Sequence, residues 1–107
     1  MRLSTLKPLA TALALAAAAG AAPAQDARAL HQRALAATCA NCHGTNGRAV
    51  DGASVPGLAG MPASYLVEQM KAFKAGARPA TVMHQLSKGF SDAQIEAVAA
   101  YFAAQKK

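Results

Sequence analysis

Cysteine is scarce in this chain of 107 residues, since Cys39 and Cys42 are its only two. A structural zinc site takes four ligands, and without a second cysteine pair it would have to recruit histidines. A disulfide between two residues so close in sequence would close a loop too short to stabilise the fold much. The scarcity of cysteine therefore argues against both kinds of site.

Strand patterns are also absent, because nowhere do apolar and polar residues alternate over a strand's length. Helical spacing is found instead over residues 26–38, over residues 63–76 after Pro62, and from residue 91 to the C-terminus. A turn or two of helix is also expected at residues 83–87, whereas residues 44–62 hold many glycines and read as a long ordered loop. The predicted fold class is all-α.

The last of these helices carries the clearest signals. Ser91 and Gln94 match a capping box, in which each side chain satisfies a backbone N–H at the helix start. An apolar stripe follows at helical spacing and should face the core. Its members are Ile95, Val98, Ala99 and Phe102.

No long apolar run occurs after residue 24, so no later segment is expected to span a membrane. The first 24 residues place Arg2 and Lys7 before an apolar stretch that ends in Ala22-Pro23-Ala24. This order is typical of a secretory signal, and the stretch is short for a spanning helix, which needs about 20 apolar residues. We predict a signal peptide over residues 1–24, cleaved after about Ala24, and a single periplasmic domain over residues 25–107.

Acidic residues are few, with five against eleven basic ones and a net charge of +6. The basic excess could steer docking to an acidic partner, although a solvated basic surface explains the same residues. Nucleic acid is not an expected partner, because the chain is exported and has no recognisable binding motif. A small exported domain usually needs a disulfide, a metal or a cofactor to stabilise it.

The two cysteines belong to the sequence Cys39-Ala40-Asn41-Cys42-His43, which fits C-x-x-C-H. In an exported chain this motif indicates covalent attachment of one c-type haem. Two thiols one helical turn apart reach the two vinyl groups of the porphyrin, and His43 supplies an axial nitrogen to the iron. A redox dithiol would be expected in a βαβ context, which this helical chain lacks.

A second axial ligand is expected on the opposite face of the haem, and methionine or histidine are the usual choices. Met83 is the predicted ligand, because it lies in an irregular segment that lets the chain return on the other side. Met61 is its main rival, and Met70 reads as core filler on the stripe of the middle helix. His84 is adjacent to Met83 and competes with it, whereas His31 reads as a surface or packing residue.

With these residues in place, the chain resembles the small class I bacterial cytochromes c. The resemblance covers the motif at residues 39–43, "VPGLAG", "YLVEQMKAFKAGARP", and Met83 with "KGFSDAQIEAVAAYFAAQ" after it. It implies a small cytochrome c fold of three to four helices wrapped around one haem. Residues 78–105 look most like the cytochrome subunit of flavocytochrome c sulfide dehydrogenase, although that resemblance leads us to expect glutamine at the position of Met61.

The resemblance also implies roles for two further residues. The carbonyl of Pro56 is expected to accept a hydrogen bond from His43, which would set the tautomer of the imidazole. Arg78 is a candidate partner for a haem propionate, with a solvated surface position as the alternative. The predicted cofactor-binding residues are therefore Cys39, Cys42, His43, Met83 and Pro56, with His43 and Met83 binding the metal.

No general base, nucleophile or open metal position is recognisable, so no catalytic residue is predicted. The resemblance implies a one-electron carrier that accepts electrons from a separate FAD-containing, sulfide-oxidising flavoprotein and passes them to a downstream acceptor. A free-standing soluble carrier between respiratory complexes is the alternative. A haem sensor or peroxidase with a displaceable methionine is a third reading.

Overall fold

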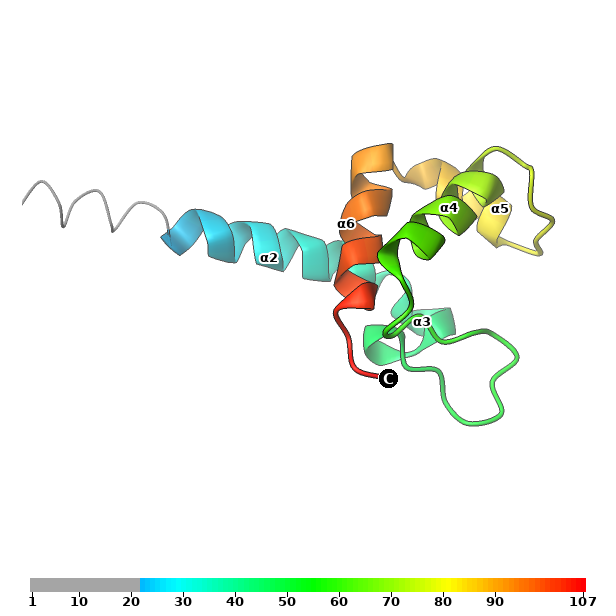
Figure 1. Cartoon of the computed structure of the whole chain (residues 1–107), viewed down its shortest axis with the longest axis horizontal. Coiled ribbons are helices and arrows are strands. Elements are labelled where there is room, and N and C mark those ends of the chain that lie inside the picture. Colours follow the sequence, from blue (N-terminus) through cyan, green and yellow to red (C-terminus); the bar gives the residue numbers. More distant parts are fainter. Residues whose placement is uncertain (1–21) are drawn as a thin grey trace, which may run out of the picture. The chain divides into compact units, whose positions relative to one another are not determined.

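The computed structural model describes residues 22–107, so all but the last three residues of the predicted signal segment lie outside the described part. Figure 1 shows a helical chain, and no residue of the described range is in a strand, which confirms the all-α prediction. The α-helices are α2 (Ala22–Ala37), α3 (Ala40–His43), α4 (Ala63–Lys74), α5 (Met83–Leu86) and α6 (Asp92–Ala103), with short 3₁₀ helices η1 (Thr45–Gly47) and η2 (Ser87–Gly89). Across residues 22–107, none of these helices has the length and apolar character that crossing a membrane requires.

The chain divides into two units, of which the first ends at His31 and the second spans residues 32–107. The boundary falls within α2, which begins four residues before the predicted start at Asp26. Alanine, the best helix former, continues upstream of Asp26, and Pro23 is tolerated in a first helical turn. In the first unit, the side chains of residues 24–31 are exposed.

The core of this second unit lies where α4 and α6 pack against each other (Figure 1). Phe102 from α6 and Leu66 from α4 are buried there with three smaller side chains, Ala36, Val98 and Ala99. Ile95 is completely buried as well, so all four members of the predicted α6 stripe point inward. Burial of this apolar surface is what holds the two helices together.

The ends of α4 and α6 follow local sequence signals. Ser91 Oγ accepts a hydrogen bond from Gln94 N at 3.2 Å, and Gln94 Oε1 accepts one from Ser91 N at 2.8 Å, which confirms the capping box. Pro62 is the N-cap of α4, and Gly76 follows the helix with a positive φ of 75°. Glycine adopts this left-handed conformation without steric cost, which is why α4 ends where predicted.

A small ionic cluster links α4 to the start of α6. Lys74 Nζ lies 3.1 Å from Asp92 Oδ1 and donates to Phe90 O at 2.7 Å, while Lys71 approaches Asp92 and Glu96 at 3.8 and 3.9 Å. The hydrogen bond and charge of Lys74 lower the pKa of Asp92 below its ordinary value. These side chains are largely solvent-exposed, so the pairs contribute little to stability.

Candidate functional site

The C-x-x-C-H motif forms a single helical turn. α2 stops at Ala37, and α3 begins at Ala40, with the carbonyl of Cys39 accepting hydrogen bonds from the backbone N–H groups of Cys42 (3.3 Å) and His43 (3.0 Å). The first helix was predicted to end at about residue 38, one residue beyond its observed end, but the start of a new helix at Ala40 was not predicted. This short turn carries both thiols and the imidazole.

The two thiols have different surroundings. Cys39 is partly buried and packs against the core cluster, whereas Cys42 is exposed, and neither forms a disulfide. Burial raises the pKa of the Cys39 thiol, and a contact of 3.9 Å with Thr38 Oγ1 acts weakly in the opposite direction. Within residues 22–107, no three side chains of His, Cys, Asp or Glu gather closely enough to hold a metal ion.

His43 is buried, and its Nδ1 atom lies 2.6 Å from the carbonyl oxygen of Pro56. A carbonyl can only accept a hydrogen bond, so Nδ1 must carry the proton and donate. In the neutral ring this leaves the lone pair on Nε2. The contact that the resemblance led us to expect is present, and it resembles the hydrogen bonds that commonly orient histidine ligands at metal sites.

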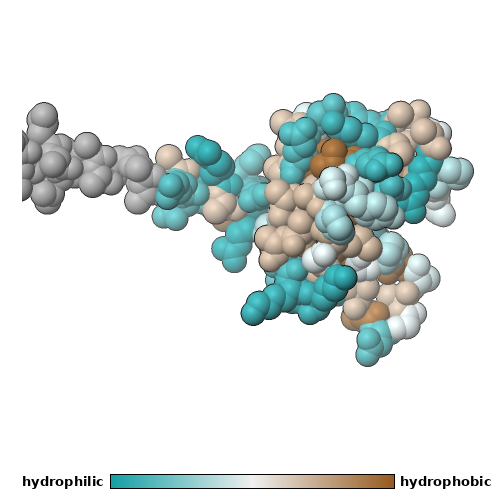
Figure 2. Space-filling view, viewed as in Figure 1, coloured by the Kyte–Doolittle hydropathy of each residue, from teal (hydrophilic) through white to brown (hydrophobic). Residues whose placement is uncertain are grey.

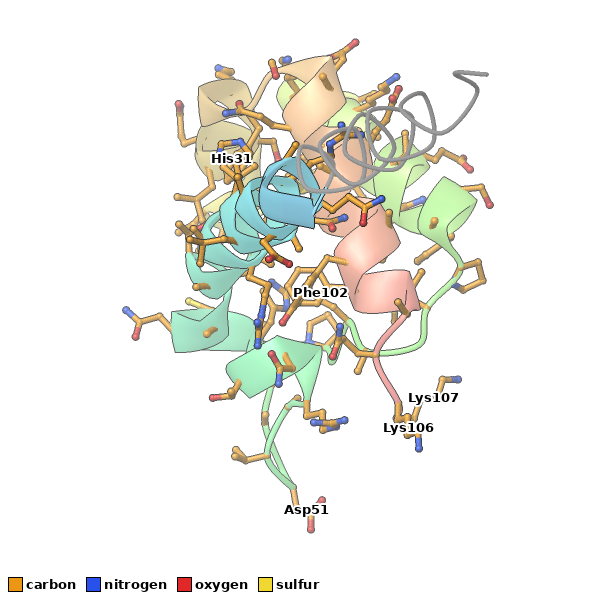
Figure 3. The ribbon with its side chains drawn as sticks, turned by 90° about the vertical axis from the view of Figure 1, so that its left-hand side faces the viewer. His31, Asp51, Phe102, Lys106 and Lys107 are labelled. Atoms are coloured by element: carbon orange, nitrogen blue, oxygen red, sulfur yellow. The ribbon has the colours of Figure 1, made fainter. Side chains whose placement is uncertain are left out.

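Pro56 reaches His43 because the loop that carries it is closed at its base. The carbonyl of Gly47 accepts hydrogen bonds from Leu58 N at 2.7 Å and from Ala59 N at 3.1 Å. Between these ends the chain projects outward, and Figure 3 shows Asp51 at its outer tip and Phe102 in the interior behind it. Apart from η1, residues 44–62 contain no helix or strand, as predicted.

The base of this loop is also fastened to the C-terminal end of α6. Tyr101 Oη donates to Asn46 Oδ1 at 2.6 Å, Gly60 N donates to Phe102 O at 2.9 Å, and Arg48 Nε donates to Lys106 O at 2.9 Å. Sequence reasoning missed all three contacts. The Asn46-Gly47 pair is a turn signal, and Asn46 does adopt a positive φ of 55°, but no local pattern names a partner 55 residues away.

The candidates for the second ligand occupy different environments. Met83 is the first residue of α5 and is partly buried. Met61 packs against the core cluster, and the sulfur of Met70 accepts a hydrogen bond from Ser87. Met70 is partly buried on α4 and is not among the side chains that pack against the core cluster, so its interpretation as core filler stays a prediction. The Nδ1 atom of His84 is buried and has no hydrogen-bond partner in the described part of the chain.

Exposed apolar side chains occur on the segments that follow the motif and that carry Met83. Val50 is 76% exposed, Val82 51% and Leu86 52%. In Figure 1 the loop after α3 and the segment before α5 project to the same side of α4. Figure 2 shows further apolar surface over α6, bordered by polar residues at the C-terminal end.

Arg78 is engaged with α4. Its guanidinium lies over the ring of Phe73, 4.6 Å from the centroid, and Nη1 donates to Gln69 Oε1. The pairing of Arg78 with a propionate stays a prediction.

The cytochrome c family model matches residues 28–106, which is most of the chain and includes the motif, the loop and all of α4 to α6. The chain belongs to the cytochrome c family. Membership of this family implies covalently bound haem c. The residues present fit that group, since they offer two thiols on one turn and a buried imidazole with its Nε2 lone pair available.

Several curated proteins are similar to this cytochrome. The thiosulfate dehydrogenase electron acceptor of Thiomonas intermedia is 42% identical over 71 residues, which is 66% of this chain and 33% of that protein. Cytochrome c-554(548) of Halomonas halodenitrificans is 38% identical and matches over 64% of this chain and 86% of that protein. The cytochrome subunit of sulfide dehydrogenase of Chlorobaculum tepidum is 35% identical, over 64% of this chain and 60% of that protein. The chain thus spans only part of the length of two of these three relatives.

Proposed function

We propose that this chain is a periplasmic one-electron carrier that accepts electrons from a sulfide-oxidising, FAD-containing flavoprotein. Cys39 and Cys42 would hold the haem covalently, His43 would bind the iron on one face and Met83 on the other. When bound, haem supplies an iron centre that cycles between the ferric and ferrous states. Export with cleavage after about Ala24 would leave residues 25–107 as the mature domain.

The hydrogen bond from His43 Nδ1 to Pro56 O is the observation that carries the ligand assignment. It fixes the tautomer, so Nε2 is the nitrogen available to iron, and it makes that nitrogen a stronger donor. The bond joins residues 13 positions apart, and the loop between them is closed at Gly47. Such support is expected around a ligand and has no evident use for a histidine that only fills space.

The remaining residues would orient the group and limit its contact with water. Cys39 packs against the core cluster, which anchors one side of the attachment turn to the helix pair. Val82 precedes α5 and Leu86 is its last residue, and these two exposed apolar side chains would help to cover the ring system whose iron Met83 binds. A methionine ligand and low solvent access both raise the reduction potential, which suits an electron acceptor.

The choice of donor rests on similarity to named relatives. One relative is a cytochrome subunit of sulfide dehydrogenase and another is a thiosulfate dehydrogenase electron acceptor. Both names describe a protein that works with a dehydrogenase acting on a sulfur compound. We favour the flavoprotein partner because the segment from Arg78 to Gln105 resembles the sulfide dehydrogenase subunit.

A free-standing carrier is the second candidate function. It is favoured by the similarity to cytochrome c-554(548), because this chain covers 86% of the length of that short protein. In that case no flavoprotein would remain bound to the chain during purification.

The ligand assignment can be tested with Met83→Ala. We expect the variant to lose the near-infrared band that marks methionine bound to ferric iron, and to have a lower reduction potential. Met61→Ala is the matched control and should keep the band, because Met61 packs in the core cluster. Survival of the band in Met83→Ala and its loss in Met61→Ala would make Met61 the ligand instead.

The donor can be tested by affinity purification of the haem-loaded protein from its native periplasm. A flavin absorbance that elutes with the haem, and haem reduction on addition of sulfide that stops when the flavoprotein is removed, are the expected results. Reduction by thiosulfate but not by sulfide would replace the proposed donor with a thiosulfate dehydrogenase. Elution as a monomer without flavin would favour the free-standing carrier.

A further inference from the structure

Ser87 has a buried hydroxyl group whose partner is unusual. The residue is 0% exposed, and its Oγ donates to the sulfur of Met70 at 3.6 Å. A thioether is a weak acceptor, so this bond compensates poorly for removing a hydroxyl from water. Alanine at this position would avoid that cost. We therefore look for the role of this hydroxyl in its hydrogen bond to the Met70 sulfur.

The same residue is bonded to Met83 through its backbone. The N–H of Ser87 donates to the carbonyl of Met83, because α5 begins at Met83 and closes its turn on Ser87. One residue thus connects the predicted iron ligand on α5 with a second methionine on α4. The packing of α5 and η2 against α4 holds the three residues together.

The three methionines of the described unit differ in what surrounds their side chains. Met61 packs against the core cluster, whereas Met70 lies outside that cluster and its sulfur is held by Ser87. The hydrogen bond from Ser87 takes up one of the two lone pairs of the Met70 sulfur and fixes the direction in which that side chain points. To bind iron in place of Met83, the Met70 side chain would have to give up this contact and turn away from Ser87.

We propose that Ser87 is a positioning residue that reserves the second iron position for Met83 by holding the Met70 thioether in a hydrogen bond. This inference rests on the proposed function, since it takes Met83 as the ligand. It concerns the choice between two chemically identical side chains, which the C-x-x-C-H motif does not address.

The test uses the haem-loaded protein and a background in which Met83 is absent. In Met83→Ala, Ser87 still holds Met70, and we expect no near-infrared methionine band. In Met83→Ala/Ser87→Ala, Met70 is released, and the band should reappear with a shifted methionine methyl resonance in the proton NMR spectrum of the ferrous protein. Adding Met70→Leu to this double variant should remove both signals again.

Two controls separate the hydroxyl from general loosening of the structure. Met83→Ala/Ser91→Ala removes a different serine hydroxyl, the cap of α6, and should show no methionine band. Met83→Ala/Ser87→Thr restores a hydroxyl and should also lack the band. If the Ser87→Ala variants do not fold, Ser87→Cys, which is close in size and a weaker donor, takes their place in the same comparison.

The outcomes distinguish this inference from the proposed function. A band that persists in Met83→Ala alone contradicts the assignment of Met83, and the inference falls with it. Loss of the band in Met83→Ala without its return in the Ser87→Ala or Ser87→Cys double variant overturns the inference and leaves Met83 as the ligand. Return of the band in the Ser91→Ala control would overturn it as well, because the effect would then not depend on Ser87.

Discussion

The pair formed by α4 and α6 and the loop of residues 44–62 are stabilised in different ways. The helix pair buries a cluster of apolar side chains, with Leu66 and Phe102 as its largest members. The loop has few buried side chains and is held by individual hydrogen bonds, among them the two that Gly47 O accepts and the one from His43 to Pro56.

Within this small unit, the helix pair mainly provides stability, whereas the loop mainly orients the side chain that we assign to function. Apolar burial is distributed over many atoms, so the helix pair provides a firm support without specifying any one geometry. The loop specifies geometry instead, because each hydrogen bond fixes one atom against another. The nitrogen that we assign to iron is oriented by the loop, and the loop is fastened to α6 through Phe102, Tyr101 and Asn46.

The largest effect is expected in the helix pair. Phe102→Ala should lower the free energy of unfolding by about 3 to 5 kcal/mol, because it removes a side chain that is only 2% exposed from the centre of the core. Denaturant unfolding of the haem-loaded protein measures this. Tyr65→Ala on α4 is the control, since that ring is 45% exposed and its loss should cost far less. Equal losses for the two variants would show that the core is not centred on Phe102.

An intermediate effect is expected in the loop. Gly47 and Gly52 both have positive φ values, 75° and 77°, so alanine at either position costs about 1 to 2 kcal/mol in backbone strain. A methyl group at Gly47 would also lie 2.8 Å from Phe102 Cδ1 and 2.9 Å from Ala59 N, whereas at Gly52 it would meet nothing within 4 Å.

The free energy of unfolding of Gly47→Ala should therefore be about 1 to 3 kcal/mol lower than that of Gly52→Ala. Gly47→Ala should also shift the reduction potential, because the base of the loop that orients His43 is displaced. Thermal unfolding and voltammetry of both variants measure the two effects. If both variants lost the same amount of stability, the Phe102 ring would move aside for the added methyl group at little energetic cost.

The smallest effect is expected at the exposed rim of the helix pair. Lys74 lowers the pKa of Asp92 in the folded protein, so the ionised carboxylate stabilises the fold. This contribution is present at neutral pH and is lost as the pH falls from about 4 through the lowered folded pKa. Asp92→Asn should therefore be slightly less stable than the unaltered protein at neutral pH, and the difference should disappear in acid.

Melting temperatures measured from neutral to acid pH, at low and high salt, test this expectation. Asp51→Asn is the control, because Asp51 stands at the tip of the loop (Figure 3) and its pH profile should follow that of the unaltered protein. A difference at Asp92 that grew in acid would contradict the assigned direction of the pKa shift.

The helices and their caps could be predicted because they depend on residues close together in sequence. The capping box at Ser91, the buried stripe ending at Phe102 and the stop at Gly76 are all confirmed. The end of the first helix was predicted to within one residue, but its start was not, since an alanine-rich stretch has no clear local boundary, and the new helical turn of α3 was not predicted either. The contacts from Tyr101 to Asn46 and from Ser87 to Met70 were also missed, because they join distant residues that follow no shared pattern.

The cofactor class could be inferred from five consecutive residues, because haem attachment requires two thiols and an imidazole at a spacing that one helical turn provides. Those five residues do not determine how the imidazole is oriented. The resemblance to a family led us to expect its bond to Pro56, but the loop that brings Pro56 there is closed by Gly47 and fastened to α6, through contacts between residues distant in sequence. The methionines are chemically equivalent, and the sequence ranked them only by the segments in which they lie. The tertiary structure gives each its own surroundings, with Met61 in the core, Met70 against Ser87, and Met83 at the start of α5.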